Sequence, residues 1–248
     1  MFILFRKGNR MKKGLLAMSV SLSLLSMSGV TQAEPSIKAG KEKSAACAGC
    51  HGETGNSLVS MYPKLASQNE EYIIKQLYAF KDGSRNGPMM SAMVAGLSKA
   101  NIQDIAAYYE SQAVSENSLP AIEIDDDDEA EEGASLTEEQ QQAVNEQKQA
   151  AETQQSAQLN SGHDIYLNGH LESEISACIA CHGPQGEGNK PAAFPALNGQ
   201  HAGYLEKTLQ DFKAGKRTNN EQNMMRMIAK RMSDKEIKDV SLYISTMK

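Results

Sequence analysis

The stretch Cys47-Ala-Gly-Cys50-His51 decides the fold, and it recurs as Cys178-Ile-Ala-Cys181-His182. These four cysteines are all that the 248-residue chain contains. Two thiols one helical turn apart can each add to a haem vinyl group while the adjoining histidine reaches the iron. The sequence therefore predicts two covalently bound haem c groups. The attachment residues are Cys47 and Cys50, then Cys178 and Cys181, and the first axial ligands are His51 and His182.

Paired cysteines also have other uses. A Cys-x-x-Cys pair can form a redox-active disulfide, and two pairs can hold a zinc ion through four thiolates. Neither use requires a histidine directly after the second cysteine in both copies, and zinc-binding pairs usually lie much closer in sequence than these two. Covalent haem is therefore the favoured interpretation.

The N-terminus has the composition of a targeting segment. A basic region at 6–13 precedes an apolar, serine-interrupted run at 14–27, and small residues follow at 30–33. We expect residues 1–33 to be a cleaved signal peptide, with translation starting at Met1 or Met11. An uncleaved membrane anchor is the alternative, although no apolar stretch of spanning length is present.

The rest of the chain divides by composition into 34–112, 113–160 and 161–248. The middle part is acidic and glutamine-rich, with Lys148 as its sole basic residue after position 122. Such a segment buries too little apolar surface to offset its ordering entropy, so we expect a solvated linker. Ser135 and Glu138 have the spacing of a capping box that would start a marginal helix there.

The outer parts are an internal repeat. The run Tyr62-Pro-Lys-Leu-Ala-Ser-Gln68 recurs as Phe194-Pro-Ala-Leu-Asn-Gly-Gln200, so one domain is duplicated. Both copies have the apolar spacing of a helix, at 70–81 and at 203–213. Each copy also ends in a further helix, with Ser98 or Ser233 as its N-cap. We therefore predict an all-α, haem-centred fold with long loops. A domain of about eighty residues is near the lower limit for a self-sufficient core, so haem would supply apolar mass.

The repeat narrows the set of candidates for the second axial ligand of each iron. The first domain has no histidine after His51, and the repeat offset leaves only Met89 with Met224 and Met90 with Met225 as matched methionines. Either pair could bind iron, and the unused methionines would fill the core. The remaining histidines, His163, His170 and His201, have no counterparts in the first copy, and we expect them at the surface or at helix starts.

The chain outside its linker resembles the dihaem cytochrome c4 group, which is built from two class I cytochrome c domains. The resemblance rests on the two haem motifs, the Tyr-Pro-Lys-Leu-Ala-Ser-Gln run, Gly-Glu-Gly-Asn at 186–189 and Phe-Lys-Ala-Gly-Lys-Arg-Thr-Asn at 212–219. In that family the axial methionine precedes a Leu-Ser pair at a fixed spacing. The resemblance thus implies Met90 and Met225 as ligands, although Met232 replaces the leucine in the second copy.

The resemblance also implies a function. It implies a periplasmic carrier of single electrons from a quinol-oxidising bc-type complex to a haem-copper oxidase, and it allows peripheral membrane association. Because His/Met ligation fills both axial positions, no small-molecule substrate and no enzymatic activity are expected. The alternative is a dihaem electron-transfer subunit of a periplasmic oxidoreductase, acting in sulfur-compound oxidation or peroxide reduction. The sequence contains no basic patch with interleaved aromatic residues, so nothing in it suggests nucleic-acid binding.

One departure concerns the linker. Members of the family join their domains by a much shorter connection than residues 113–160. We hypothesise that the two domains still pack together while the acidic segment loops outward. The sequence also leaves open whether that segment steers docking onto a basic partner.

Overall fold

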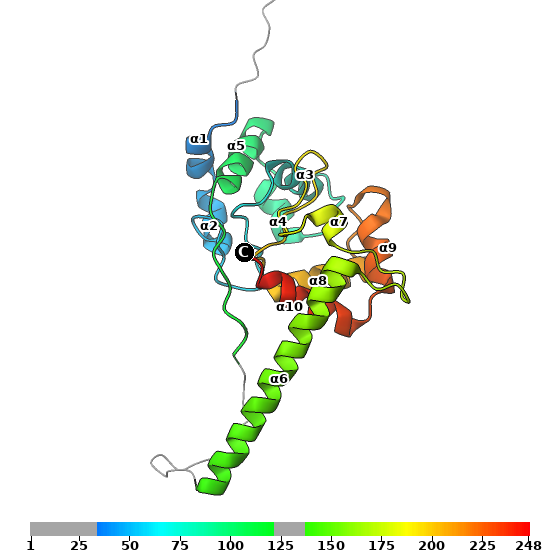
Figure 1. Cartoon of the computed structure of the whole chain (residues 1–248). Coiled ribbons are helices and arrows are strands. Elements are labelled where there is room, and N and C mark those ends of the chain that lie inside the picture. The colour runs from blue at the N-terminus through cyan, green and yellow to red at the C-terminus, as the bar shows by residue number, and fades with distance from the viewer. Residues whose placement is uncertain (1–33, 122–136) are drawn as a thin grey trace, which may run out of the picture. The chain divides into compact units, whose positions relative to one another are not determined.

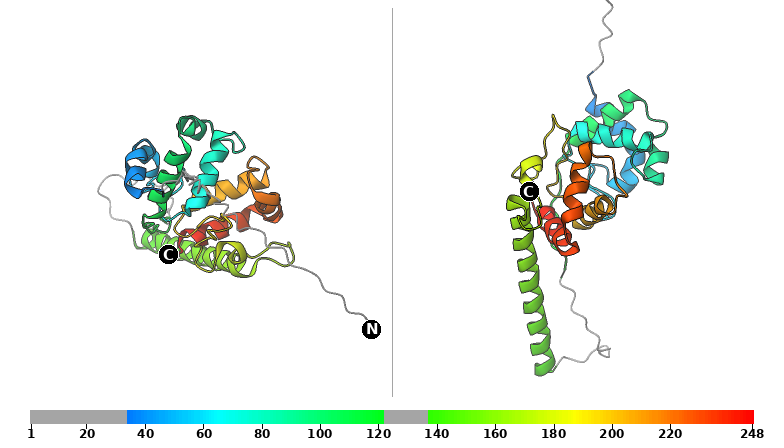
Figure 2. Two further views of the ribbon diagram at one scale, coloured as in Figure 1. Left: turned by 90° about the horizontal axis from the view of Figure 1, so that it is seen from above. Right: turned by 90° about the vertical axis from the view of Figure 1, so that its right-hand side faces the viewer.

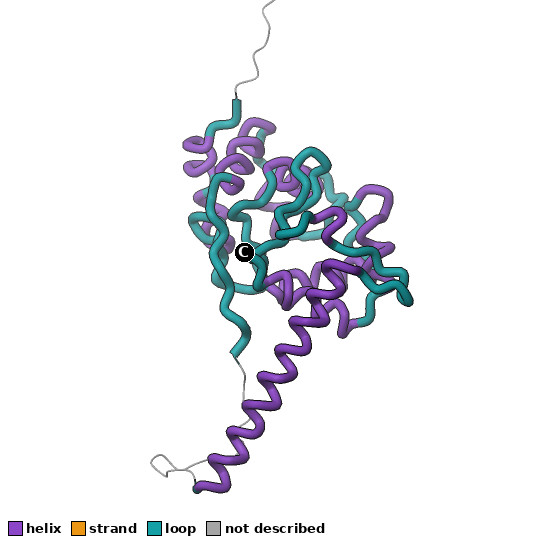
Figure 3. Tube along the Cα trace, viewed as in Figure 1, coloured by secondary structure: helices purple, strands orange, loops and turns teal. Residues whose placement is uncertain are grey.

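The computed structural model describes residues 34–121 and 137–248, where the regular secondary structure is helical and no strand occurs (Figure 3). Two isolated bridges, His170 with Ile175 and Asn189 with Phe194, are the extended pairings found in these ranges. The predicted signal peptide and most of the acidic run lie outside the described residues. Of the helices in the described ranges, none has both the length and the apolar character needed to cross a bilayer.

The helices repeat in the same order in both halves (Figure 1). The first half contains α1 (Ile37–Lys43), α2 (Ala45–His51), α3 (Glu70–Lys81), α4 (Pro88–Val94) and α5 (Lys99–Glu110). The second contains α6 (Glu138–Asn168), α7 (Ile179–His182), α8 (Ala202–Lys213), a 3₁₀ turn η1 (Glu221–Asn223), α9 (Met224–Arg231) and α10 (Asp234–Ser245). The helices predicted at 70–81 and 203–213 are confirmed as α3 and α8.

Each half is built on the same crossing of its first and last helices. Gly40 of α1 lies against α5, where a Cβ would stand 2.7 Å from the Cβ of Tyr108. Gly162 of α6 lies against α10, where a Cβ would stand 2.2 Å from the carbonyl oxygen of Asp239. Because only glycine permits so close an approach, both crossings depend on the missing side chain. The core of each half lies beside its crossing and includes Tyr109 in the first and Tyr166 in the second.

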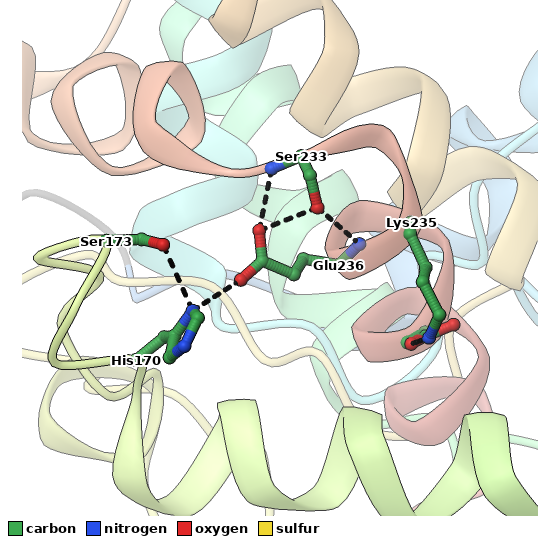
Figure 4. A network of polar contacts seen from close by, with 6 residues as sticks. His170, Ser173, Ser233, Lys235 and Glu236 are labelled. Carbon is green, nitrogen blue, oxygen red and sulfur yellow. Dashed lines mark hydrogen bonds and ion pairs between the residues drawn. The ribbon is translucent and has the colours of Figure 1, made fainter.

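The N-terminus of α10 is fixed by a polar network (Figure 4). The Oγ of Ser233 accepts from the backbone N–H of Glu236, and a carboxylate oxygen of Glu236 accepts from the backbone N–H of Ser233. His170 Nδ1 lies 2.8 Å from the other carboxylate oxygen. Partial burial raises the pKa of Glu236, but the bonds from Ser233 and His170 outweigh it and keep that pKa below its usual value. The predicted capping box is confirmed, as is Ser98 at the start of α5.

Helix α6 joins the linker to the second domain. It begins after Thr137, whose capping box is formed with Gln140. The predicted box partner Ser135 lies outside the described residues. The first turns of α6 extend away from the other helices (Figure 2), whereas its last turns bury Gly162, Ile165 and Tyr166 against α10. The expected boundary between 160 and 161 therefore falls inside a continuous helix, because the first helix of the second domain starts within the linker.

The start of the predicted linker is held against the protein. Asn56 Nδ2 donates to the carbonyl of Ala113 at 2.9 Å, and Lys64 Nζ donates to the carbonyl of Ser115 at 2.6 Å. Asn117 Nδ2 donates to the carbonyls of Gly199 and Ser245, at 2.8 and 3.0 Å. Residues 113–117 thus link the first domain to the second as an ordered segment.

We predict that Gly162→Ala lowers the free energy of unfolding by about 1–3 kcal/mol, because the new methyl group would overlap the backbone of α10. Chemical denaturation of the dihaem protein measures the change. Gly203→Ala is the matched control, since the nearest atom to a Cβ there lies 3.8 Å away. Alanine at 203 should be neutral or stabilise the helix by up to about 1 kcal/mol. Equal stability of the two variants would contradict the close crossing.

Candidate haem-binding sites and the interface between them

The two cysteine motifs occupy equivalent short helices. Cys47, Cys50 and His51 lie on α2, whereas Cys178 caps the N-terminus of α7 and precedes Cys181 and His182 on it. In both copies a glycine with a φ of 79°, Gly52 or Gly183, follows the histidine and ends the helix. A left-handed residue lets the chain turn away directly after the histidine. Each motif therefore presents two thiols and one imidazole on a single turn.

Each motif histidine is oriented by a proline carbonyl. His51 Nδ1 lies 2.9 Å from the carbonyl oxygen of Pro63, and His182 Nδ1 lies 3.0 Å from that of Pro195. A carbonyl oxygen can only accept, so Nδ1 carries the proton and Nε2 keeps its lone pair. Burial lowers the pKa of both histidines, which favours the neutral imidazole. A neutral ring with a free Nε2 lone pair is the form that binds iron.

Aromatic side chains lie beside both histidines. The ring centroid of Tyr62 lies 6.2 Å from that of His51, and Phe194 lies 6.4 Å from His182. These aromatic residues directly precede the two prolines that orient the histidines. The repeated Tyr-Pro and Phe-Pro pairs thus supply both an apolar contact and a hydrogen-bond acceptor to each imidazole.

The four motif cysteines are free thiols, so no disulfide occupies them. Burial raises the pKa of Cys47, and it raises that of Cys178 to about 11. In the part of the chain that the structure describes, no three His, Cys, Asp or Glu side chains gather as a metal-binding group. The donor set of each motif therefore fits haem c and not a shared zinc ion.

The matched methionines lie on equivalent helices. Met89 and Met90 belong to α4, and Met224 and Met225 begin α9. Met90, Met224 and Met225 are half-buried, whereas Met89 is 60% exposed. Burial therefore favours Met90 over Met89 in the first copy and does not separate Met224 from Met225 in the second, and the choice of Met90 and Met225 as ligands stays a prediction.

The other histidines take structural roles, and that of His201 reaches the first domain. His163 lies 3.4 Å from Asp164 on the exposed side of α6, and His170 joins the network that caps α10. His201 precedes α8 and donates from Nε2 to the carbonyl of Ser57 at 2.9 Å. These positions match the expected surface and helix-start locations.

Two buried glutamines join the domains reciprocally. Gln200 accepts from the N–H of Lys64 at 2.8 Å and donates to the carbonyl of the same residue at 2.9 Å. Gln68 makes the same two bonds to Ala196, both at 2.8 Å. Each pair maps onto the other when the repeats are exchanged, which is the signature of a two-fold arrangement. The hypothesis that the domains pack is confirmed, and Pro35–Lys248 forms one unit.

The interface and the histidines share the same turns. Pro63 accepts from His51, and the next residue, Lys64, is bonded to the glutamine of the other domain. Pro195 and Ala196 repeat this arrangement for His182. Docking of one domain therefore fixes the backbone that orients the histidine of the other.

Comparison with known proteins agrees with this architecture. A profile of the family described as Cytochrome c matches residues 37–113 and 159–248. Cytochrome c4 of Azotobacter vinelandii is 35% identical over 238 residues, which cover 92% of this chain and 97% of that protein. The chain belongs to the dihaem cytochrome c4 family.

A solved structure and a second group of relatives extend the comparison. The crystal structure of reduced recombinant cytochrome c4 from Pseudomonas stutzeri is 33% identical, with a TM-score of 0.70, and covers 86% of this chain and 100% of that one. A protein named thiosulfate dehydrogenase electron acceptor, from Thiomonas intermedia (strain K12), is 31% identical over 214 residues, covering 86% of this chain and 83% of that protein.

The comparison establishes three points for this cytochrome c4. Its fold is a tandem duplication of a class I cytochrome c domain, as predicted. It carries two covalently bound haem c groups, and it is an electron-transfer protein. The sequence analysis did not identify Gln68 and Gln200 as interface residues. Their signal was present, because a glutamine ends the repeated run in both copies.

We predict that Gln200→Ala weakens the docking of the two domains, because it leaves the buried N–H and carbonyl of Lys64 unpaired at a cost of roughly 1–3 kcal/mol for each group. Calorimetry should then resolve two unfolding transitions in place of one shared transition. Gln68→Ala should have the same effect through Ala196. The exposed Gln141→Ala on α6 is the control. An unsplit transition in both interface variants would contradict the role of these bonds.

Proposed function

We propose that this cytochrome c4 carries single electrons in the periplasm from a quinol-oxidising bc-type complex to a haem-copper oxidase. The first haem would be held by Cys47 and Cys50 with His51 and Met90 on the iron. The second would be held by Cys178 and Cys181 with His182 and Met225. The observation that carries the proposal is the reciprocal glutamine pairing, since a carrier with two haems in one rigid unit can pass electrons between them.

The ligand chemistry supports a carrier over an enzyme. Haem c supplies one-electron chemistry at its iron. Histidine and methionine would together supply the two protein ligands of each iron, a pair that raises the reduction potential of haem. On the protein side, the carbonyls of Pro63 and Pro195 hold each imidazole in one tautomer and one orientation. A fixed ligand set keeps structural change small when the charge on the iron changes.

The periplasmic location rests on the predicted leader at 1–33. Fractionation of cells that express the full chain tests it, because a periplasmic protein is released when the outer membrane is opened. Retention in the membrane fraction after a salt wash would favour the uncleaved anchor instead.

A second candidate function is acceptance of electrons from a sulfur-oxidising enzyme. The relatives named thiosulfate dehydrogenase electron acceptor favour it, because they align with most of this chain. The two functions differ in the donor. Stopped-flow mixing of the oxidised cytochrome with a reduced bc-type complex, and separately with thiosulfate dehydrogenase and thiosulfate, compares the two reduction rates. Fast reduction only by thiosulfate dehydrogenase would replace the respiratory assignment.

We predict that Met90→Ala and Met225→Ala each remove about half of the methionine-to-iron charge-transfer band of the oxidised protein, because each haem loses its sixth ligand while its thioether bonds remain. Visible spectra and a haem count measure this. Met89→Ala and Met224→Ala are the matched controls and should retain the full band. Loss of the band in a control, with retention in Met90→Ala or Met225→Ala, would move the ligand to the neighbouring methionine.

A further inference from the structure

The helix crossings of the two halves contain equivalent aspartates that make different hydrogen bonds. A Cβ on Gly40 would overlap the backbone carbonyl of Asp104, and a Cβ on Gly162 would overlap that of Asp239. Asp104 lies on α5 and Asp239 lies on α10, the last helix of each half. Because the glycines and the aspartates match in pairs, the repeat predicts the same hydrogen bonds for both carboxylates.

The first carboxylate has partners for both of its oxygens. One oxygen of Asp104 accepts from the backbone N–H of Ser36 at 2.7 Å, and the other accepts from Lys43 Nζ. Ser36 is the N-cap of α1, and its φ of -105° and ψ of 110° are extended. An N-cap residue lies outside the helical ladder, so its N–H is free to donate to another group. Asp104 therefore stabilises the residue at which α1 begins.

The second carboxylate lacks one of these bonds. Asp239 is fully buried, and one of its oxygens accepts from Lys235 on the preceding turn of α10. The other oxygen, Oδ1, is buried and has no hydrogen-bond partner among residues 34–121 and 137–248. A buried acceptor without a partner destabilises the conformation that contains it, and more so when it belongs to a charged group. Asp239 thus has the position of Asp104 without the helix start that Asp104 binds.

The helix start is missing because α6 is longer than α1. Ser36 lies four residues before Gly40. The residue four before Gly162 is Gln158, which lies inside α6. Inside an α-helix the N–H of residue 158 bonds to the carbonyl four residues earlier, so it cannot donate to Asp239. The cytochrome c profile supports the same match, since it begins at 37 and again at 159. The turns of α6 before 159 are therefore an addition to the domain.

The added turns of α6 are held weakly. Residues 138–157 are largely polar and mostly exposed, and they extend away from the other helices (Figure 2). They are joined to another segment through Gln155, whose Nε2 donates to the carbonyl of Pro120 at 3.1 Å. The turns after 159 instead bury Gly162, Ile165 and Tyr166. A polar helix with little packing is marginal in water, so a helix that begins at 159 gives up few side-chain contacts.

We propose that α6 has a joint at residues 158 and 159, at which it exchanges between the straight helix and a broken form. In the broken form the helix begins at Leu159, and the backbone N–H of Gln158 donates to the free oxygen of Asp239. This bond is the counterpart of the one from Ser36 to Asp104 in the first half. Water solvates the backbone groups that the break exposes, whereas the buried carboxylate gains a partner from the chain.

The joint allows part of the linker to move while the domains stay docked. The acidic run is attached to the N-terminal end of α6, so a bend at the joint changes the point from which that run starts. Gln68 and Gln200, which join the domains, lie on other segments and keep their bonds in both forms. The joint therefore separates movement of the added turns from the geometry of the two haem sites.

Hydrogen exchange of the full-length dihaem protein, followed by NMR in the reduced state, tests the joint. In the broken form the N–H groups of 159–161 lose their helical partners, so they should exchange faster than those of 165–168. Gln158→Ser supplies the residue type found at Ser36 and should speed exchange at 159–161 by roughly 2-fold to 30-fold. Asp239→Ala removes the acceptor of the broken form and should slow that exchange about tenfold. Gln154→Ser, one turn earlier, is the control and should change it less than about twofold.

A proline at the joint gives an independent test. Leu159→Pro suits the first position of a helix and pushes residue 158 into an extended conformation, but it disrupts a straight helix. We expect a full haem count and a melting temperature within roughly 2–4 °C of that of Leu159→Ala. Asp164→Pro is the matched control, because position 164 lies inside the helix in both forms and its side chain is exposed. This control should lower the melting temperature much further.

Combining two changes separates capping by Asp239 from simple fraying of the helix. Asp239→Ala should leave the melting temperature of the unsubstituted protein nearly unchanged. In the Leu159→Pro protein the same change should lower it, because the bond from Gln158 is lost. Asp104→Ala should be destabilising with or without the proline, since Asp104 already accepts from Ser36.

Three results would overturn the proposal. Exchange at 159–161 as slow as at 165–168, in both the unsubstituted protein and Gln158→Ser, would mean that the helix stays straight. An equal effect of Asp239→Ala with and without the proline would mean that Asp239 caps no broken form. A melting temperature for Leu159→Pro as low as that for Asp164→Pro would mean that the domain does not accept a helix beginning at 159.

Discussion

The structure depends on four buried hydrogen bonds made by two glutamine side chains. Each amide replaces a backbone partner, donating to and accepting from one residue of the other domain. Buried amide and peptide groups must be paired, so the domains have one favourable docking position. The bonded residues directly follow Pro63 and Pro195, whose carbonyls orient the motif histidines. One constraint thus sets both the relation of the domains and the direction of each imidazole.

Duplication explains why so few residue types build both sites. Each half uses a glycine to bring its first and last helices together, and each places an aromatic-proline pair beside its histidine. The halves differ where the second is longer. Three additional residues separate Arg217 from Met224 compared with Arg85 and Met89, and that segment contains Gln222 and Asn223 with positive φ. The first helix of the second half, α6, is also much longer than its counterpart α1, and it joins the linker to the core. The two haem motifs consequently have the same residue types in unequal surroundings.

Charge is distributed unevenly over the molecule. The acidic residues gather between the domains in sequence, whereas a buried arginine, Arg217, and a half-buried one, Arg85, each bond a tyrosine of the other domain. The relatives named cytochrome c4 and thiosulfate dehydrogenase electron acceptor share this duplicated scaffold, so surface charge is one feature by which such carriers could distinguish their partners.

The sequence by itself determined the cofactor, the duplication and most helices. Covalent haem attachment depends on five adjacent residues, and helix caps such as Ser98 and Ser233 involve residues three or four positions apart. Local sequence is therefore enough to predict both features. It also reduced the axial methionines to two matched pairs. Only the tertiary structure decided that Gln68 and Gln200 join the domains, that Gly162 lies inside the linker-borne helix, and that Arg85 and Arg217 face each other's tyrosines. The glutamine and arginine contacts join residues more than a hundred positions apart, and their partners are fixed by packing and by the pairing of buried polar groups.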